Sequence, residues 1–372
     1  MLRKFLKKMT LCTGIFISVL SILEADVIEL KSNTDYIVTE TRSNHIVLVN
    51  ANEKKVVNQC ELKEMFSPGA IVLAPNNKYA FILAGYGEKI AGYDITNCER
   101  IFHTNLTQAN IKGQAISTIA VSEDSKKVYV TYNRTEMSND KYKVFDPYFS
   151  VYNVSDGLEA KAVKSFKIPR QITMLNVAKD GTIYAFGSQL YFINPNTEKI
   201  GIAKKLLGWQ KDGYSNPDSV ASFIVSRPLG DYTTLYTTTK YNNSKNPSAE
   251  EGTLYWGITS VDLSTNKIIQ EEFTEYETLM FTAMRNPKDL NILYGVFNDL
   301  TKFDIKNKKV LKRVGLDHTY YGVSVSPDGK KLYLGNCLDD IAIYDADTLK
   351  KLGNIDLPGD MGAAGLQVFH TK

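Results

Sequence analysis

The sequence lacks the residues that usually build a cofactor or metal site. Its 372 residues include only four cysteines and four histidines. No Cys-x-x-Cys pair occurs, which excludes covalent attachment of a c-type haem through Cys-x-x-Cys-His. The histidines are scattered, without the spacing typical of metal ligands, and we interpret them as polar strand or turn residues. His318 is the one we single out, because it precedes Tyr320 and Tyr321; the four are His45, His103, His318 and His370.

Motifs for catalysis are also missing. No Gly-x-Ser-x-Gly elbow is present, and the spacing of Gly85, Gly87 and Gly92 fits neither a dinucleotide nor a phosphate loop. Acidic pairs such as Asp339-Asp340 lie in expected loops or outer strands, where a solvated charge is the usual outcome. We therefore predict no catalytic, cofactor-binding or metal-ligating residue in this chain, which looks more like a rigid platform than a catalyst.

Neither positive nor negative charge is in excess once the first 25 residues are set aside. The chain has 44 Lys and Arg against 41 Asp and Glu, and residues 1–25 hold all of the difference. This leaves no concentrated cationic face for nucleic acid. A basic start precedes an apolar run, 11–23, that is short for a bilayer of ~30 Å, and small Ala25 follows. We predict a cleaved signal peptide over 1–25 and export to the periplasm, with a retained anchor as the alternative.

A repeated turn is present instead. Seven β-like runs end in Asp or Asn, followed by a polar stretch and a second β-like run. Such side chains accept hydrogen bonds from backbone N–H groups two residues further on and so begin turns. A strand-rich repeat of roughly 40–50 residues is typical of a β-propeller. The seven turn residues are Asn50, Asp94, Asn153, Asn194, Asp262, Asp304 and Asp345.

A second repeat, exemplified by SPDGKKLYL at 326–334, marks inner hairpins. Together the repeats predict four-stranded units near 69–107, 113–168, 169–206, 214–274, 277–316 and 317–357. The first unit has only three strands, near 35–40, 45–50 and 55–62, and 365–370 supplies the fourth, which closes the ring. We predict an all-β, seven-bladed propeller of antiparallel blades, in one domain spanning 26–372. The insertions 134–147 and 241–252 are expected to be long surface loops.

Three cysteines remain after cleavage at residue 25, and two of them lie in neighbouring repeats. Cys60 falls in an outer strand and Cys98 in the turn before the next outer strand. In an oxidising compartment a disulfide between them is one interpretation. The other is that Cys60, Cys98 and Cys337 are isolated structural cysteines.

Two segments resemble a known family. The run IPRQITMLNVAKDGTIYAFGSQLYFINP (168–195) is similar to part of the quinohaemoprotein amine dehydrogenase β subunit, and the chain from Leu316 resembles its closing blade. The likeness extends from about residue 35 to the C-terminus and is strongest over 168–195 and 314–372. It implies a seven-bladed propeller, YVTN-like in its repeats, within a periplasmic complex of three different subunits that oxidatively deaminates primary amines.

In that family the β subunit has no redox group of its own. A small γ subunit carries cysteine tryptophylquinone, and a larger α subunit carries two c-type haems. The β subunit holds the quinone subunit and helps to wall off the substrate cavity. The resemblance thus implies a scaffold and pocket role for this chain, which would be non-catalytic by itself.

Five residues are candidates for the cavity or the subunit interface, because they lie near the starts of inner strands or carry aromatic or Arg side chains favoured there. The candidates are Arg170, Gln171, Trp209, Tyr320 and Tyr321. For each of them, ordinary packing is the alternative.

Two other interpretations concern the whole chain. One is a free-standing propeller that binds a ligand or a protein. The other is an independent enzyme, a lactonase or a d1-haem reductase, which would need inward-facing ligands.

Overall fold

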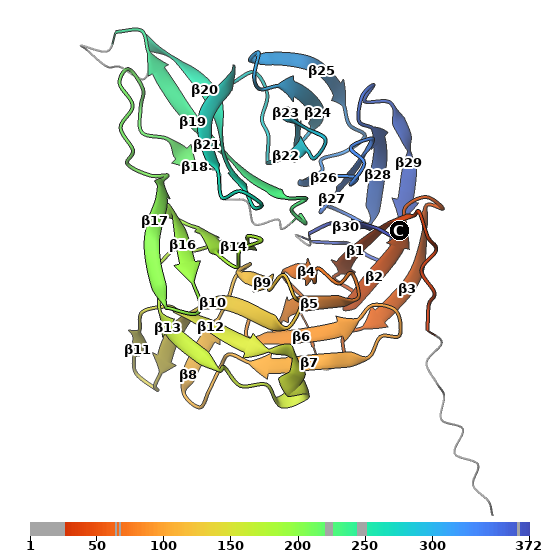
Figure 1. Ribbon diagram of the computed structural model, residues 1–372, viewed down its shortest axis with the longest axis vertical. Coiled ribbons are helices and arrows are strands. Elements are labelled where there is room, and N and C mark those ends of the chain that lie inside the picture. Colours follow the sequence, from red (N-terminus) through yellow and green to blue (C-terminus); the bar gives the residue numbers. More distant parts are fainter. Residues whose placement is uncertain (1–26, 64, 67, 220–225, 244–250, 363–364) are drawn as a thin grey trace, which may run out of the picture.

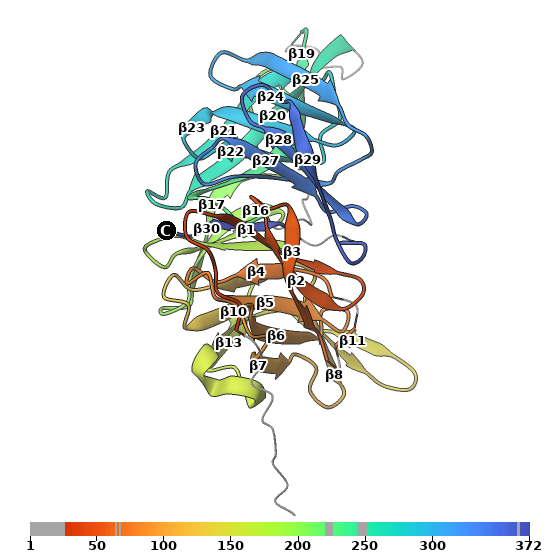
Figure 2. The ribbon, with the colours of Figure 1, turned by 90° about the vertical axis from the view of Figure 1, so that its right-hand side faces the viewer.

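The protein is a closed ring of seven antiparallel sheets around a central tunnel (Figure 1). The computed structural model describes residues 27–63, 65–66, 68–219, 226–243, 251–362 and 365–372. The predicted all-β, seven-bladed architecture is confirmed. The predicted signal peptide, 1–25, lies outside the described residues. Figure 2 shows the ring from its side.

Each blade has four main strands, ordered from the tunnel outward. Blade 1 is β30 (Gln367–His370), β1 (Asp35–Thr41), β2 (His45–Asn50) and β3 (Lys55–Glu61); blade 2 is β4 (Ile71–Leu73), β5 (Tyr79–Ala84), β6 (Lys89–Asp94) and β7 (Arg100–Asn105); blade 3 is β9 (Ile119–Val121), β10 (Lys127–Met137), β12 (Tyr148–Asn153) and β13 (Lys164–Lys167). Blade 4 is β14 (Met174–Val177), β15 (Ile183–Phe186), β16 (Gln189–Asn194) and β17 (Lys199–Lys205).

The remaining blades follow the same order. Blade 5 is β18 (Asp218–Ser219), β19 (Asp231–Tyr241), β20 (Gly252–Asp262) and β21 (Ile268–Glu275); blade 6 is β22 (Thr282–Asn286), β23 (Asp289–Val296), β24 (Asp299–Asp304) and β25 (Lys309–Gly315); blade 7 is β26 (Gly322–Val325), β27 (Lys331–Gly335), β28 (Asp340–Asp345) and β29 (Lys351–Asp356). Blade 3 also carries β8 (Ile111–Gln114) and β11 (Tyr142–Val144), and a 3-10 turn, η1 (Val154–Glu159), follows β12.

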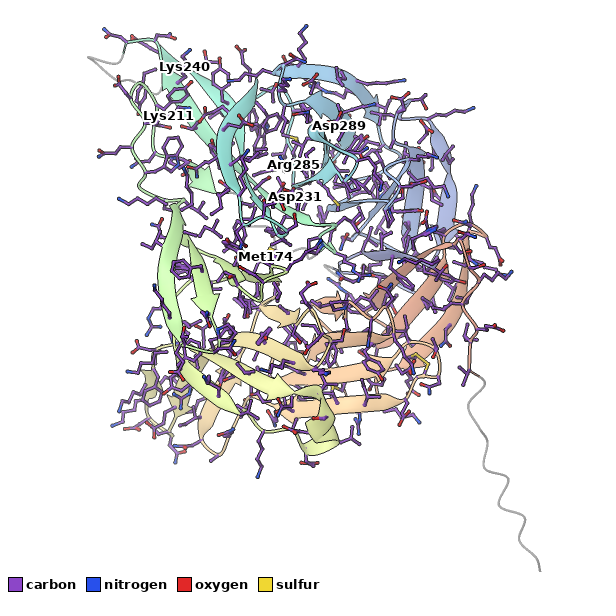
Figure 3. All side chains as sticks on the ribbon, viewed as in Figure 1. Met174, Lys211, Asp231, Lys240, Arg285 and Asp289 are labelled. Atoms are coloured by element: carbon purple, nitrogen blue, oxygen red, sulfur yellow. A yellow bond between two sulfur atoms is a disulfide. The ribbon has the colours of Figure 1, made fainter. Side chains whose placement is uncertain are left out.

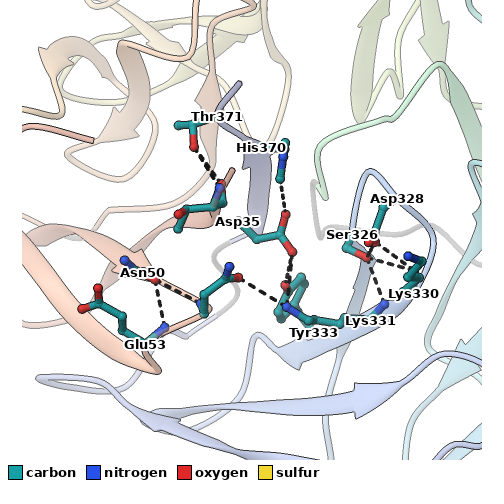
Figure 4. Close-up of polar contacts among 12 residues, drawn as sticks. Asp35, Asn50, Glu53, Ser326, Asp328, Lys330, Lys331, Tyr333, His370 and Thr371 are labelled. Carbon is teal, nitrogen blue, oxygen red and sulfur yellow. Dashed lines mark hydrogen bonds and ion pairs between the residues drawn. The ribbon is translucent and has the colours of Figure 1, made fainter. Parts of the chain in front are cut away.

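The ring closes as predicted, because the C-terminal strand β30 pairs antiparallel with β1. Side chains reinforce this closure (Figure 4). Asp35 accepts a hydrogen bond of 2.9 Å from the Tyr333 hydroxyl of blade 7, and its other oxygen lies 2.8 Å from His370 Nδ1. Blade 1 is thus joined both to its own last strand and to blade 7, and β1 has no unpaired edge.

The predicted turn chemistry is present at six of the seven Asp and Asn positions. Asp94, for example, accepts from Thr96 N at 2.9 Å, and Asp345 accepts from Thr348 N at 2.7 Å. The same arrangement occurs at Asn50, Asn194, Asp262 and Asp304. Asn153 differs, because it precedes η1 and its side chain makes no hydrogen bond to the backbone there.

The prediction of a long surface loop at 134–147 is wrong. β10 continues to Met137, and its extension pairs with β8 on one side and with β11 on the other. A long strand that leaves its blade exposes backbone donors and acceptors on both edges, and these two short strands satisfy them. The insertion at 241–252 falls partly outside the described residues, while β19 and β20 pair as far as Tyr241 and Gly252.

The two neighbouring-repeat cysteines are bonded. Cys60 of β3 and Cys98, in the turn between β6 and β7, form a disulfide that links blades 1 and 2. Cys337 is a free, partly buried thiol. The cross-link joins the outermost strand of blade 1 to blade 2, and blade 1 is also the blade that the C-terminal strand completes.

Candidate functional site

Two ends of the tunnel can be distinguished from the chain direction. We call the end at which each innermost strand begins the upper face; it carries the connections between blades and the turns between second and third strands. The opposite end, the lower face, carries the Asp and Asn turns. Arg170, Gln171, Trp209, Tyr320 and Tyr321 all belong to connections of the upper face.

Exposed apolar side chains are concentrated on the upper face. Of the 18 exposed large hydrophobic residues in the described chain, 11 lie on its connections or adjoining strand ends. All four aromatic side chains in the set are among them. Apolar surface gathered on one side of a soluble protein is typical of an interaction site. The 11 residues are Phe66, Tyr86, Ile116, Met137, Tyr142, Val144, Leu207, Leu254, Tyr276, Leu279 and Leu338.

Three of these residues form a cluster over blades 2 and 3. The rings of Phe66 and Tyr86 meet edge to face with centroids 5.4 Å apart, although each is more than half exposed. The turn that carries Tyr86 is held against the connection containing Ile116, because Ala115 N donates to Gly87 O at 2.9 Å. Gly87 has φ +80°, and a Cβ there would lie 1.9 Å from Ala115 O, so only glycine allows this close approach. We call Phe66, Tyr86 and Ile116 the upper cluster.

Several exposed upper-face residues have left-handed backbone conformations. Tyr86, Gln171 and Leu338 have φ of +56°, +66° and +61°. Side chains other than glycine, asparagine and aspartate rarely adopt this region, and such residues gather at binding sites where the surrounding structure enforces them. The backbone therefore presents these three side chains outward at an energetic cost.

Arg170 and Gln171 lie on the connection between blades 3 and 4. Both are exposed. Arg170 donates to Phe145 O at 3.0 Å and lies 3.7 Å from Asp146, so its guanidinium is tied to the neighbouring blade-3 insertion. Gln171 borders a cavity of about 70 Å³ that also contacts Ile116 of the upper cluster.

Trp209 packs against blade 5 rather than projecting freely. It is half-buried, and its ring meets Tyr236 edge to face at 6.1 Å. Tyr236 in turn donates to Glu272 at 3.1 Å, and Lys211 pairs with that carboxylate. The indole N–H of Trp209 is buried without a hydrogen-bond partner in the described structure.

The two adjacent tyrosines have different environments. Tyr320 is 1% exposed and donates to Asp340 Oδ2 at 2.8 Å; its ring lies 4.1 Å from that of His318. His318 Nε2 is 2.9 Å from the other oxygen of Asp340, so the three side chains form one network. Burial and the hydrogen bond to Asp340 raise the pKa of Tyr320. We therefore interpret Tyr320 as a packing residue, which is the alternative to a role in the cavity.

Tyr321 is only partly buried and contacts two phenylalanines. Its ring centroid lies 4.8 Å from that of Phe281 and 6.1 Å from that of Phe297. The structure therefore places Gln171 and Tyr321 at the surface of the upper face, on connections that lead into blades 4 and 7. It does not bring the five predicted residues together in one site.

A feature that sequence reasoning missed lies inside the tunnel. The segment 226–230, which precedes β19, crosses toward other blades: Ser226 Oγ donates to Val323 O at 3.2 Å and Arg227 N to Leu366 O at 3.2 Å. The Arg227 guanidinium reaches the blade-2 turn and donates to Asn77 Oδ1 at 2.6 Å. No repeat signal marks this segment, so the sequence offers no means of finding it.

A cavity of about 250 Å³ lies beside Arg227 in the lower half of the tunnel. Its wall is largely apolar and comes from inner strands β4, β9 and β14, with Leu263 from a lower-face turn. Glu123 and Lys179, both exposed, border it with opposite charges. Burial lowers the pKa of Arg227 to about 10, and the charge of Glu123 opposes that shift.

Comparisons with known proteins bear on the fold. No protein-family model matches the sequence, and no curated protein matches it significantly. Among solved structures, the dihydro-heme d1 dehydrogenase NirN has a TM-score of 0.54 and 11% identity, over 92% of this chain and 76% of that chain. The periplasmic gluconolactonase PpgL of Pseudomonas aeruginosa has a TM-score of 0.54 and 12% identity, over 91% and 100%.

Hydrazine synthase of Kuenenia stuttgartiensis is also similar, with a TM-score of 0.52 and 15% identity, over 89% of this chain and 97% of that chain. At these identities the likeness establishes the propeller fold, and function has to be argued from the site.

The described residues contain no group of three or more His, Cys, Asp or Glu side chains that could hold a metal ion. Nor does any helix within them have the length and apolar character needed to cross a bilayer.

Proposed function

We propose that this chain is the β subunit of an exported quinohaemoprotein amine dehydrogenase. In this proposal it is a periplasmic scaffold that holds a quinone-bearing γ subunit, next to a haem-bearing α subunit. The proposal is supported by the resemblance over 168–195 and 314–372. The structural observation that carries it is the concentration of exposed apolar side chains on the upper face, which also bears Gln171 and Tyr321.

The upper face would contribute a wall rather than reacting groups. The quinone of the γ subunit supplies the oxidising chemistry, and the propeller excludes water from the space where the amine is held. Apolar side chains on this face are suited to this, since their contact area selects the amine's side chain. Tyr321 and Gln171 are the residues of this chain that we assign to the cavity or to the subunit contact.

The proposal is tested by purifying the tagged, exported chain from its host. We expect a haem-staining subunit and a small quinone-staining subunit to copurify. Replacing Phe66 and Tyr86 by Asp should abolish that copurification, because charge is placed in the centre of the upper cluster. Leu158→Asp is the matched control, since Leu158 is an exposed leucine in η1 on the lower face.

A propeller that purifies alone from its host would overturn the subunit assignment. Loss of copurification in the control as well as in the double variant would show that the upper face has no special role. Circular dichroism of both variants separates loss of docking from loss of the fold.

A second function, that of a free-standing ligand-binding propeller, is favoured by one observation. The cavity beside Arg227 combines an apolar wall with a cationic group, which is a common composition of small-molecule sites. It lies toward the lower face and is therefore separate from the upper cluster.

A further inference from the structure

Arg227 is a half-buried cation that has no carboxylate within ion-pair distance in the described residues. No ion pair involving it occurs in the described residues, and its one side-chain hydrogen bond goes to the neutral amide of Asn77. The sequence between Ser219 and Ser226 contains no acidic residue that could serve instead. A charge that is partly withdrawn from water is stabilised by an opposite charge, and a guanidinium with free N–H groups is well shaped for a carboxylate.

A second arginine beside the tunnel, Arg285, differs from Arg227 because it has a carboxylate partner. Arg285 has its own carboxylate, Asp231, with hydrogen bonds of 3.0 Å and 2.5 Å from Nε and Nη2. Both side chains are buried. The fold therefore supplies a fixed counter-ion for one tunnel arginine and leaves the other beside an open volume.

The second observation is the composition of that volume. Val72, Ile119 and Leu175 form an apolar wall, and the nearby Asn176 side-chain nitrogen is buried without a hydrogen-bond partner in the described structure. The size, about 250 Å³, is just below the usual range of ligand pockets, ~300–1,000 Å³, and suits a small molecule. Glu123 and Lys179 at the border have opposite charges, so Arg227 sets the sign of the electrostatic potential inside the cavity.

We propose that the cavity beside Arg227 binds a small carboxylate that carries a short apolar group. The carboxylate pairs with the free N–H groups of Arg227, and the apolar group lies against Val72, Ile119 and Leu175. A carboxylate is favoured over a simple inorganic anion because most of the wall offers no polar contact. The site lies in the lower half of the tunnel, so its occupation does not require a partner on the upper face.

Three probes of similar size test the proposal on the purified full-length exported chain. Butyrate, 1-butanol and butylamine differ in charge at neutral pH while keeping a four-carbon skeleton. We expect saturable binding of butyrate by isothermal titration calorimetry and a rise in melting temperature that increases with its concentration. Butanol and butylamine should bind at least tenfold more weakly. Equal binding of all three, or no butyrate binding, would overturn the proposal.

Variants locate the binding within the cavity. Arg227→Gln should weaken butyrate binding at least tenfold, whereas Arg227→Lys should retain part of it because the charge remains. Val72→Phe keeps the cation but fills the cavity, and it should also abolish binding; it serves as the independent test if Arg227→Gln does not fold. Lys179→Gln, at the exposed border, should change the affinity no more than about twofold. Unchanged binding in either Arg227→Gln or Val72→Phe, with the fold intact, would contradict the assignment.

Discussion

Asp231 and Arg285 form a buried, two-bonded ion pair between blades 5 and 6 (Figure 3). Asp231 begins β19 and Arg285 lies near the end of β22, so the pair fastens neighbouring blades beside the tunnel. Each carboxylate oxygen of Asp231 accepts one hydrogen bond, and this pair of bonds matches the planar, forked arrangement of the guanidinium N–H groups. Because the two side chains are about 7–8% exposed, neither has water to replace its partner.

The first prediction concerns this pair. Asp231→Ala leaves Arg285 buried and unpaired, which should lower the free energy of unfolding by about 3–5 kcal/mol. Urea denaturation followed by circular dichroism measures it. Glu277→Ala removes the exposed partner of Arg313 and should cost less than about 1 kcal/mol. Similar losses in the two variants would show that the buried pair adds nothing beyond an exposed one.

The second prediction concerns the disulfide between blades 1 and 2. Replacing Cys60 and Cys98 by Ser removes a cross-link with a sequence separation of 38, and chain entropy predicts a loss of about 4 kcal/mol. The urea midpoint of the double variant should match that of the wild type under reducing conditions. Cys337→Ser is the control, because that thiol is free. Thiol labelling that finds Cys60 and Cys98 reactive in the unfolded protein without reductant would contradict the bond.

The third prediction concerns Glu40, a carboxyl group in β1 that is 2% exposed. Burial raises its pKa well above the ordinary value of 4.5, and Oε2 has no hydrogen-bond partner in the described structure. Above pH 4.5 the unfolded chain releases this proton while the folded chain retains it. Rising pH therefore destabilises the fold by roughly 1.4 kcal/mol per pH unit from this group, until the folded-state pKa is reached.

Glu40→Gln should remove that contribution. The difference in unfolding free energy between variant and wild type should therefore grow in favour of the variant from pH 4.5 toward neutrality. Carboxylates with lowered pKa, such as Asp94, contribute with the opposite sign in both proteins and cancel in the difference. A difference that stays constant with pH would show that Glu40 titrates normally.

The fourth prediction concerns closure of the ring. Deleting 365–372 removes β30 and leaves β1 with an unpaired edge, so we expect aggregation on size-exclusion chromatography. An added peptide of the same eight residues should restore monomer by pairing with β1, whereas a scrambled peptide should not. A truncated chain that remains monomeric with an unchanged melting temperature would show that β30 is dispensable.

Part of this structure could be predicted from local chemistry alone. Turns begun by Asp94 or Asp345 depend on side-chain hydrogen bonds within two or three residues, so each blade leaves its own mark in the sequence. The contacts of Arg227 are different, since Asn77 and Leu366 lie far away in the chain and meet it only after the ring has closed. The upper cluster could not be predicted for the same reason: Phe66, Tyr86 and Ile116 come from three separate connections.

The final prediction separates the two adjacent tyrosines. Successive side chains of an extended segment point to opposite sides, which explains why Tyr320 is buried on Asp340 while Tyr321 stays partly exposed. Tyr321→Ala should change amine preference or retention of the γ subunit and leave the melting temperature of the isolated propeller within about 2 °C. Tyr320→Phe should lower the free energy of unfolding by about 1–3 kcal/mol, because Asp340 loses a buried donor, and it should leave the amine preference unchanged.

Kinetics with amines of different chain length on the purified complex measure the effect of Tyr321→Ala. Unfolding of the isolated propeller measures the effect of Tyr320→Phe. If Tyr321→Ala assembles and turns over every amine as the wild type does, Tyr321 has no place in the cavity or the interface.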